Sequence, residues 1–514
     1  MYSVKKEAKR ISGPIFFCIM SYLLGAVALA YIPVLNKNLV DVLFSGDYQA
    51  KNFIILIIMY AVLYAFYLLT VWCAEKLSWV MSLRFENMLK KSVFEKLTRL
   101  SYNVFSRKSS EEYLSIMTNN IETIEMDYLP PLVNLIFESI SIVVYAVLIC
   151  VYTSPLICVC LAVLSVLSVF TPGFYKKRLS ERRKAYLDER AAYSKKLVDL
   201  FDGFSLVDRK TAQTFCAQNN EYTDNLTEKR RKYGYTKVAG NTFSGGMIMA
   251  VDVVVFVLCG ILAIKGKITA GVIVAAISYA KSFTEPVEEI LYDINTLNGT
   301  KEVIKEFEDF QNQADDRDVL TRAQPVKRID VRDVTVAFPE KTLTYNVTIE
   351  KGKKYLLTGE SGCGKTTLLN VLTGRQPFEG SLLIDGSEGT LQPEDCFYLD
   401  QNQHVFASPY AENVSLFGAY PEGTSHFWSE AFHPAELKNA SDCTLLSGGE
   451  QQWMKAIRAM GQQKAILLLD EPFSALDRET ASKLVKAIES LDSTIVLVTH
   501  DESLFDASVW TTLG

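Results

Sequence analysis

One loop constrains this chain more than any other feature, because its glycines and its closing Lys-Thr pair fit a single phosphate-binding pattern. The loop reads Gly359-Glu360-Ser361-Gly362-Cys363-Gly364-Lys365-Thr366 and matches G-x-x-x-x-G-K-[ST] at every fixed position. An apolar run at 355–357 precedes it, and a run typical of a helix at 367–372 follows. In a strand–loop–helix setting, backbone N–H groups approach phosphate oxygens and the helix N-terminus adds positive potential. The sequence therefore predicts an ATP-binding α/β domain.

The residue types in the loop suggest separate tasks. Lys365 is expected to reach the β- and γ-phosphates, and the Thr366 hydroxyl to ligate Mg²⁺. For Cys363 the plainest interpretation is a small residue that fits the loop, with thiol reactivity as a side effect. The predicted ATP contacts of the loop are Gly359, Glu360, Ser361, Gly362, Cys363, Gly364, Lys365, Thr366 and Thr367.

Further motifs follow the loop in order and make a chance glycine-rich turn a poor explanation. They are Gln401, Leu446-Ser447-Gly448-Gly449-Glu450-Gln451, Ile466-Leu467-Leu468-Leu469-Asp470-Glu471-Pro472, Ser474-Ala475-Leu476-Asp477 and Thr499-His500-Asp501. With these motifs, roughly residues 328–514 resemble the nucleotide-binding domain of an ATP-binding cassette (ABC) transporter.

The resemblance implies roles for the predicted catalytic residues. Asp470 would hold Mg²⁺ through water, Glu471 would be the general base, and His500 would contact the γ-phosphate and hold the water–Glu471 geometry. Gln401 would reach Mg²⁺ and the attacking water. Phe338 would stack on adenine, although a core aromatic is the alternative.

The resemblance also implies a dimer. Ser447, Gly448, Gly449 and Glu450 would cap the ATP held by a partner's phosphate loop, and Asp477 would lie at the dimer interface. Glu450 is a departure, because Gln is commoner at that position. One chain is then a half-transporter. A second half-transporter would complete it, as a homodimer or a heterodimer.

The N-terminal half is apolar enough for a membrane. A spanning helix needs about 20 mostly apolar residues, and six segments qualify: 14–35, 53–74, 129–152, 154–173, 241–264 and 268–290. Lys and Arg crowd the N-terminus and the connections at 84–108, 176–196 and 209–237, so both termini are expected in the cytoplasm. The sequence predicts an α-helical six-span transmembrane domain plus an α/β P-loop NTPase domain.

The spacing of the spans predicts the domain organisation. Residues 1–298 form the transmembrane domain with two long intracellular loops, 299–327 a linker, and 328–514 the ATP-binding cassette domain. By resemblance to exporter-type ABC proteins, the loop tips lie near 109–118 and 203–215. The short stretch from Gln401 to Ser447 predicts a trimmed helical subdomain, and the chain end at Gly514 predicts no further strand after His500.

Two acids lie inside predicted spans, Glu138 and Asp252. Charges at membrane depth are costly and usually face a cavity or a partner. They are therefore candidates for a substrate pathway that accepts a cationic compound. Pairing to another helix, or a position nearer the membrane interface, is an equal alternative.

We expect ATP-driven transport across a membrane by alternating access, with export favoured, ATP and Mg²⁺ as cofactors, and the lipid bilayer as a partner. The alternatives are an importer with an exporter-type fold, such as a metal-chelate carrier, and a non-transporting membrane regulator. A net charge of −6 gives no indication of nucleic-acid binding. Compactness and the absence of a transit peptide favour a bacterial cell membrane, and the transported substrate stays unknown.

Overall fold

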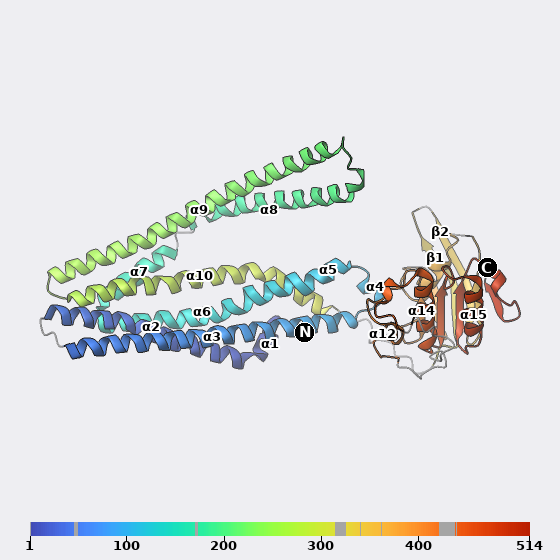
Figure 1. The fold of residues 1–514 in the computed structure, drawn as a ribbon, viewed down its shortest axis with the longest axis horizontal. Coiled ribbons are helices and arrows are strands. Elements are labelled where there is room, and N and C mark those ends of the chain that lie inside the picture. Colours follow the sequence, from blue (N-terminus) through green and yellow to red (C-terminus); the bar gives the residue numbers. More distant parts are fainter. Residues whose placement is uncertain are drawn as a thin grey trace. The chain divides into compact units, whose positions relative to one another are not determined.

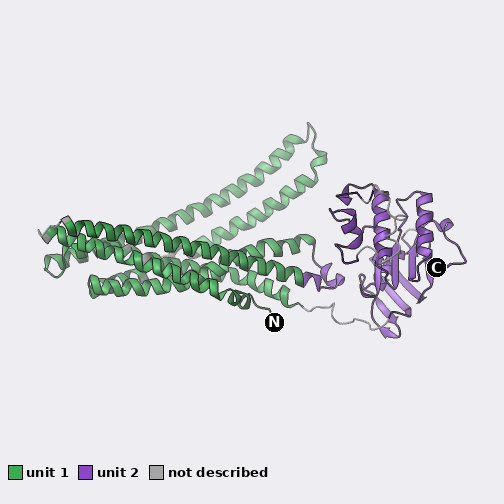
Figure 2. Cartoon of the chain, turned by 60° about the horizontal axis from the view of Figure 1, so that its bottom comes forward, with its two compact units in different colours: residues 1–95, 110–313 green, residues 96–109, 314–514 purple. Residues whose placement is uncertain are grey.

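The chain divides into two compact units, each described by itself. The computed structural model describes residues 2–45, 50–169, 173–313, 325–339, 341–360, 362–420, 437 and 439–513. The first unit is Met1–Glu95 with Ser110–Gln313, and the second is Lys96–Ser109 with Ala314–Gly514 (Figure 2). Residues 96–109 therefore belong with the C-terminal unit although helices of the first unit flank them in sequence.

The first unit is built from long helices (Figure 1). They are α1 (Val4–Arg10), α2 (Ser12–Ser45), α3 (Ala50–Thr98), α5 (Ser110–Ser115), the π-helical turn η1 (Ile116–Asn120), α6 (Ile121–Tyr152), α7 (Pro155–Val169), α8 (Gly173–Asp202), the 3₁₀ turn η2 (Phe204–Leu206), α9 (Ala212–Ile264) and α10 (Ala270–Asn312). Helices α6 and α10 pack along each other and α2 packs on both. Turn η2 lies at the tip of the hairpin formed by α8 and α9, where the second loop tip was predicted.

All six predicted apolar segments lie in helices over their described residues, except that Ser154, Ile268 and Thr269 precede the first helical residue of their segments. Four helical stretches are long and apolar enough to cross a membrane: Ser12–Phe44, Phe53–Thr98, Ser110–Tyr152 and Ala212–Ile264. The segment at 154–173 contains a shorter apolar helix, Pro155–Ser165. The segment at 268–290 lies in α10, whose apolar part carries several charged residues and is not among those four.

A contact between Thr300 and Asp127 marks the register of α6 against α10. Pro131 lies inside α6 and has no N–H to donate to the carbonyl of Asp127 four residues earlier. The Thr300 hydroxyl of α10, itself buried, lies 3.3 Å from that carbonyl and 2.9 Å from the Thr296 carbonyl of its own helix, which is the shorter of its two hydrogen bonds. Pro131 thus leaves a backbone acceptor of α6 free beside a hydroxyl of α10.

The C-terminal unit contains two sheets. Its strands are β1 (Arg328–Ala337), β2 (Thr342–Glu350), β3 (Lys354–Leu357), β4 (Glu379–Ile384), β5 (Ser387–Glu388), β6 (Cys396–Leu399), β7 (Ile466–Asp470), β8 (Thr494–Val498) and β9 (Trp510–Leu513). Its helices and turns are α4 (Tyr102–Phe105), α11 (Lys365–Leu372), α12 (Tyr410–Ser415), η6 (Cys443–Leu445), α14 (Gly448–Gly461), α15 (Arg478–Glu489) and η7 (Glu502–Leu504). The antiparallel sheet has the order β2-β1-β4-β5, and the parallel sheet has the order β6-β7-β8-β3-β9.

The parallel sheet is buried on both faces, as its unbroken apolar strands require. Every residue of β7 and β8 is buried. Helix α11 and the antiparallel sheet contribute to the core on one face, and α14 and α15 to the core on the other. This packing holds the carboxyl ends of β3, β7 and β8 at one edge, where the predicted site residues begin.

One expectation about the C-terminal end of the chain is wrong. A further strand does follow His500, because β9 pairs in parallel with β3, from Lys354 opposite Trp510 to Leu357 opposite Leu513. The apolar Trp510 side chain is buried in the core, and its indole N–H donates to Glu489 at 2.8 Å. Much of the predicted helical subdomain, 421–436, lies outside the described residues.

Candidate functional site

The phosphate-binding loop joins the end of β3 to the start of α11, as its sequence predicts. Gly359, Gly362 and Gly364 have φ angles of 132°, 82° and 108°, in the left-handed region that favours glycine. At Gly364 a side chain would also collide, since a Cβ there would lie 2.4 Å from the Tyr345 hydroxyl oxygen. That hydroxyl donates to the Gly364 carbonyl at 2.8 Å, which ties the loop to strand β2.

The Lys365 ammonium folds over its own loop. Its Nζ donates to the Gly359 carbonyl at 2.7 Å and to the Glu360 carbonyl at 3.1 Å. Lys341 of the neighbouring sheet segment donates in the same way to the Gly362 carbonyl. Two ammonium groups therefore lie at the loop, which makes its mouth attractive to a polyanion.

The loop borders a cavity of about 380 Å³. Its lining residues are Phe338, Lys341, Leu343, Gly362, Gly364, Lys365, Thr366, Thr367, Gln401, Glu471 and His500. Of the predicted contacts, Gly359, Glu360 and Cys363 belong to the loop but do not line the cavity, and Ser361 lies outside the described residues. Phe338 is 39% exposed, so its ring is available at the cavity rather than packed in the core.

Sequence reasoning missed Lys341 and Leu343. Both come from the turn and strand that follow Phe338, and the antiparallel pairing of β1 with β2 brings them beside the loop. The lysine shortly after a predicted adenine contact was a weak signal. Its distance from the loop in sequence hid the contact.

Glu471 and His500 lie together at the carboxyl ends of β7 and β8. His500 Nε2 is 3.1 Å from Glu471 Oε1. Glu471 has a φ of 49°, unusual for a residue with a side chain, and it is held there because its N–H donates to the Val498 carbonyl at 3.0 Å and its carbonyl accepts from Gln452 at 3.1 Å. Such overdetermined strain is common at functional sites.

Asp470 is the one predicted site residue that is almost fully buried, at 1% exposure. Neither of its carboxylate oxygens has a hydrogen-bond partner among the described residues. Burial raises the pKa of Asp470, against a smaller opposing effect from the nearby Thr366 hydroxyl. A buried carboxylate left unsatisfied in this way is suited to a cation or to water held by one.

The Ser447 motif begins α14 and does not line the loop cavity. The Ser447 side chain caps the helix, and Glu450 closes a capping box because its Oε2 accepts from the Ser447 N–H at 2.8 Å and from the Ser447 hydroxyl at 2.6 Å. These bonds lower the pKa of Glu450. Gly448 is exposed, with open space around its Cα, so the motif is accessible from outside the chain.

Asp477 has a structural task in this chain. It caps α15, since one carboxylate oxygen accepts from the Thr480 N–H at 2.9 Å and the other from the Thr480 hydroxyl at 2.6 Å. Its side chain is exposed at the surface beside a second cavity of about 360 Å³ that shares Glu471 and His500 with the first.

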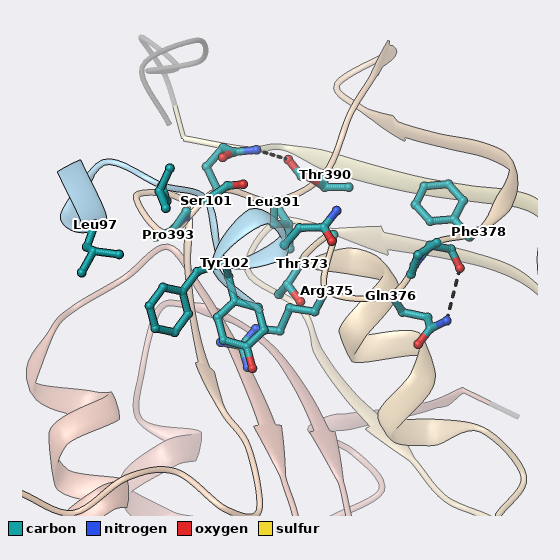
Figure 3. A pocket seen from close by; sticks show the side chains of 16 residues that line it. Leu97, Ser101, Tyr102, Thr373, Arg375, Gln376, Phe378, Thr390, Leu391 and Pro393 are labelled. Carbon is teal, nitrogen blue, oxygen red and sulfur yellow. Dashed lines mark hydrogen bonds between the residues drawn. The ribbon is translucent and has the colours of Figure 1, made fainter. Parts of the chain in front are cut away.

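Within the C-terminal unit, the segment 96–109 packs against the residues that follow α11. A cavity of about 680 Å³ is lined by residues of the stretch 97–105 together with residues of 373–378 and 390–393 (Figure 3). These residues precede the predicted first loop tip, 109–118, whose position stays a prediction. The Arg375 guanidinium lies 4.3 Å from the Tyr102 ring centre and 4.5 Å from the Tyr398 ring centre. Arg375 also pairs with Asp400 at 3.1 Å, next to Gln401 of the ATP cavity. No sequence pattern indicated this cluster.

The two predicted acids of the first unit are separated. Glu138 lies on α6, half-buried against α10, while Asp252 is exposed on α9. The charges that act on Glu138 are those of Glu289, Asp293 and Glu285 of α10, and Asp252 is not among them. The structure therefore groups Glu138 with acids that sequence reasoning did not single out.

Comparison with known proteins covers most of the chain. A family model described as ABC transporter transmembrane region matches residues 15–287, and one described as ABC transporter matches residues 343–474. The chain is 24% identical to the ATP-dependent lipid A-core flippase of Photobacterium profundum, over 84% of this chain and 78% of that protein. It is 23% identical to the uncharacterized ABC transporter ATP-binding protein YfiC of Bacillus subtilis (strain 168), over 80% of this chain and 72% of that protein. The Fe(3+) ions import ATP-binding protein FbpC of Escherichia coli (strain K12) is 33% identical over 34% of this chain and 55% of that protein.

Proposed function

This chain belongs to the ABC transporter family, and from that premise we propose how its residues couple ATP to transport. It is a membrane protein that binds and hydrolyses ATP to drive transport. The observation that carries the residue assignments is the Glu471–His500 pair, 3.1 Å apart at the edge of the cavity that Lys365 also lines.

Glu471 is proposed to be the general base. Its carboxylate would accept a proton from the water that attacks the γ-phosphate, while His500 holds the carboxylate orientation and contacts the phosphate. Lys365 and the loop amides would stabilise the charge that develops on the phosphate oxygens. Phe338, exposed at the same cavity, is proposed to stack on the adenine ring.

The residues present fit a magnesium ion. Asp470 carries two carboxylate oxygens with no partner among the described residues, and Thr366 and Gln401 line the same cavity. All three offer the oxygen ligands that Mg²⁺ prefers. When bound, the ion would neutralise phosphate charge, and Asp470 would hold it through water.

The motif from Ser447 to Glu450 is proposed to cap ATP held by a second chain. Supporting this, the motif is accessible at the start of α14 and none of its residues lines the cavity of its own chain. The partner would be another half-transporter with a matching cassette, and Asp477, exposed near Glu471, would face it.

The direction is proposed to be export, with both chain termini in the cytoplasm of a bacterial cell. The relative from Photobacterium that covers most of the chain is a flippase, whereas the iron-import relative matches only the ATP-binding part. The Lys and Arg distribution supports the orientation. The proposed domain bounds are those derived from the spacing of the spans.

The test is ATP hydrolysis by the full chain in lipid nanodiscs. Glu471→Gln is expected to lower the rate by roughly 10²- to 10⁴-fold, the usual contribution of a general base, while a fluorescent ATP analogue still binds. Glu479→Gln, an exposed acid of α15 paired with Lys483, is the matched control and keeps the wild-type rate. A Glu471→Gln chain as active as the control would refute the assignment of the base.

A further inference from the structure

The register of α6 and α10 brings an acidic face of each helix together. The Thr300–Asp127 contact marks the register of the antiparallel pair, which packs along its length. Three helical turns further along each helix, Glu138 of α6 comes opposite Glu289 of α10. Consistent with this, the charge of Glu289 acts most strongly among those on Glu138, followed by those of Asp293 and Glu285.

The acids of α10 form a stripe. Glu285, Glu289 and Asp293 are spaced four residues apart and therefore lie on one helix face. Glu285 and Glu289 are exposed, whereas Asp293 is only 2% exposed. The stripe thus runs from an open surface into the packing between the two helices.

Two buried polar atoms beside the stripe lack a protein partner. Asp293 Oδ2 and the Ser141 hydroxyl have no hydrogen-bond partner among the described residues, and Ser141 is 1% exposed. Ser141 follows Glu138 by one turn on α6, so it faces the same side. Buried polar atoms of this kind are nearly always satisfied by something, here by a group outside the described residues.

Among the described residues, no cation forms an ion pair with three of these acids. Among the side chains that the structure describes, no Lys, Arg or His forms an ion pair with Glu138, Glu289 or Asp293. Carboxylates at membrane depth are costly without a counter-charge. The described residues also contain no group of three acids, cysteines or histidines arranged to hold a metal ion.

An aromatic side chain completes the surroundings. Tyr145, two turns from Glu138 on the same face of α6, is 6% exposed, and its hydroxyl lies within electrostatic range of Glu138 and of Tyr67 on α3. Carboxylates next to aromatic rings suit organic cations, because the ring faces attract positive charge and the ring carbons accept apolar groups.

We propose that the facing sides of α6 and α10, at Glu138, Glu289 and Asp293, bind the cationic group of an organic substrate. This assignment rests on the proposed transport function and gives its cargo a chemical class. Asp252, which the sequence suggested alongside Glu138, is not part of the site.

The experiment compares two ions of one shape and opposite charge. The full chain, free of nucleotide, is placed in nanodiscs of uncharged phosphatidylcholine, and saturable binding of tetraphenylphosphonium and tetraphenylborate is measured against empty nanodiscs. The cation is expected to bind saturably and the anion not. Equal binding of the two ions, or no saturable binding of the cation, would overturn the proposal.

Variants locate the site. Glu138→Gln and Asp293→Asn are each expected to weaken binding of the cation by about tenfold, the effect of losing one charge-assisted contact. Glu289→Gln should do the same, and because this carboxylate is exposed its loss does not disturb packing. Glu302→Gln, an exposed acid elsewhere on α10, is the control with unchanged binding. If Glu289→Gln binds as the control does, the acids serve structure or pair with a partner chain, and the proposal fails.

Failure of the cation site can be distinguished from failure of the proposed ATP mechanism. Binding is measured without nucleotide, so a chain that binds the cation but never hydrolyses ATP would contradict the ATP mechanism and leave this site standing. A chain that hydrolyses ATP and ignores the cation would do the reverse.

Discussion

At the scale of single residues, Asp470 is almost fully buried, and neither of its carboxylate oxygens has a hydrogen-bond partner among the described residues. That combination lowers the stability of the folded unit when no cation is bound, because the charged form is desolvated. Its neighbour Glu471 is held in a left-handed backbone conformation. Asp470 and Glu471, adjacent at the end of β7, thus both lower the stability of the folded unit at the point where hydrolysis is proposed.

Replacing the Asp470 carboxylate by a neutral amide tests this cost. Without Mg²⁺ or nucleotide at pH 7, Asp470→Asn is expected to stabilise the C-terminal unit by about 1 kcal/mol, part of the usual penalty for an unsatisfied buried group. Hydrolysis is expected to fall sharply. Hydrogen exchange of β7 and α11 in the full chain reports the stability, and a variant that exchanges faster than the wild type would contradict the argument.

The same substitution has a defined pH dependence. Burial raises the pKa of the folded carboxyl above its ordinary value of 3.8. Below pH 3.8 the group is protonated in both folded and unfolded chains, so the two proteins should match. As the pH rises above 3.8 the unfolded chain ionises first, which destabilises the wild type and lets the advantage of Asp470→Asn grow until the pH passes the folded pKa.

At the scale of secondary-structure elements, helix α4 shows how the segment 96–109 is held in the C-terminal unit. It is four residues long, too short to be stable alone, yet it packs within the C-terminal unit beside the residues that follow α11. The Arg375 guanidinium lies between the rings of Tyr102 and Tyr398 and also pairs with Asp400. One arginine therefore connects α4 to the segment that leads into Gln401.

Removing the Tyr102 ring should loosen this connection. Tyr102→Ala is expected to lower hydrogen-exchange protection of residues 96–109 by about 0.5–2 kcal/mol, the range of a cation–π contact. Tyr102→Phe keeps the ring and should keep the protection. If the two variants exchange alike, the contact with Arg375 does not hold the segment.

At the scale of the whole molecule, the proposed ATP site takes residues from two chains. The motif at Ser447 starts α14 outside the loop cavity, while Lys365, Glu471 and His500 line that cavity. A dimer in which each chain caps the other's nucleotide accounts for both placements. In such a dimer, each ATP site would use Lys365 of one chain and Ser447 of the other.

Mixing two inactive chains tests that arrangement. Lys365→Ala and Ser447→Arg are each expected to abolish hydrolysis alone, since each variant damages both sites of its own homodimer. Mixed dimers carry one site with both defects and one intact site, so co-expression should recover activity. If purified mixed dimers are inactive, each chain caps its own nucleotide and the arrangement is contradicted.

Much of this protein could be predicted from local sequence. The loop from Gly359 to Thr366, the strand before it and the helix after it follow from glycine spacing and apolar runs, because backbone freedom and periodicity are local properties. The long helices of the first unit follow from apolar length in the same way. The extra strand β9 was missed because its pairing with β3 joins segments far apart in the chain.

By itself, the sequence determined that the chain binds ATP and spans a membrane, since a phosphate loop and apolar runs act through neighbours in the chain. The tertiary structure alone decided which distant residues meet. It placed Arg375 against Tyr102, left Asp470 buried without a partner among the described residues, and set Glu138 opposite the acids of α10 and apart from Asp252. Such encounters depend on helix register and sheet order, which long-range packing selects and no local pattern encodes.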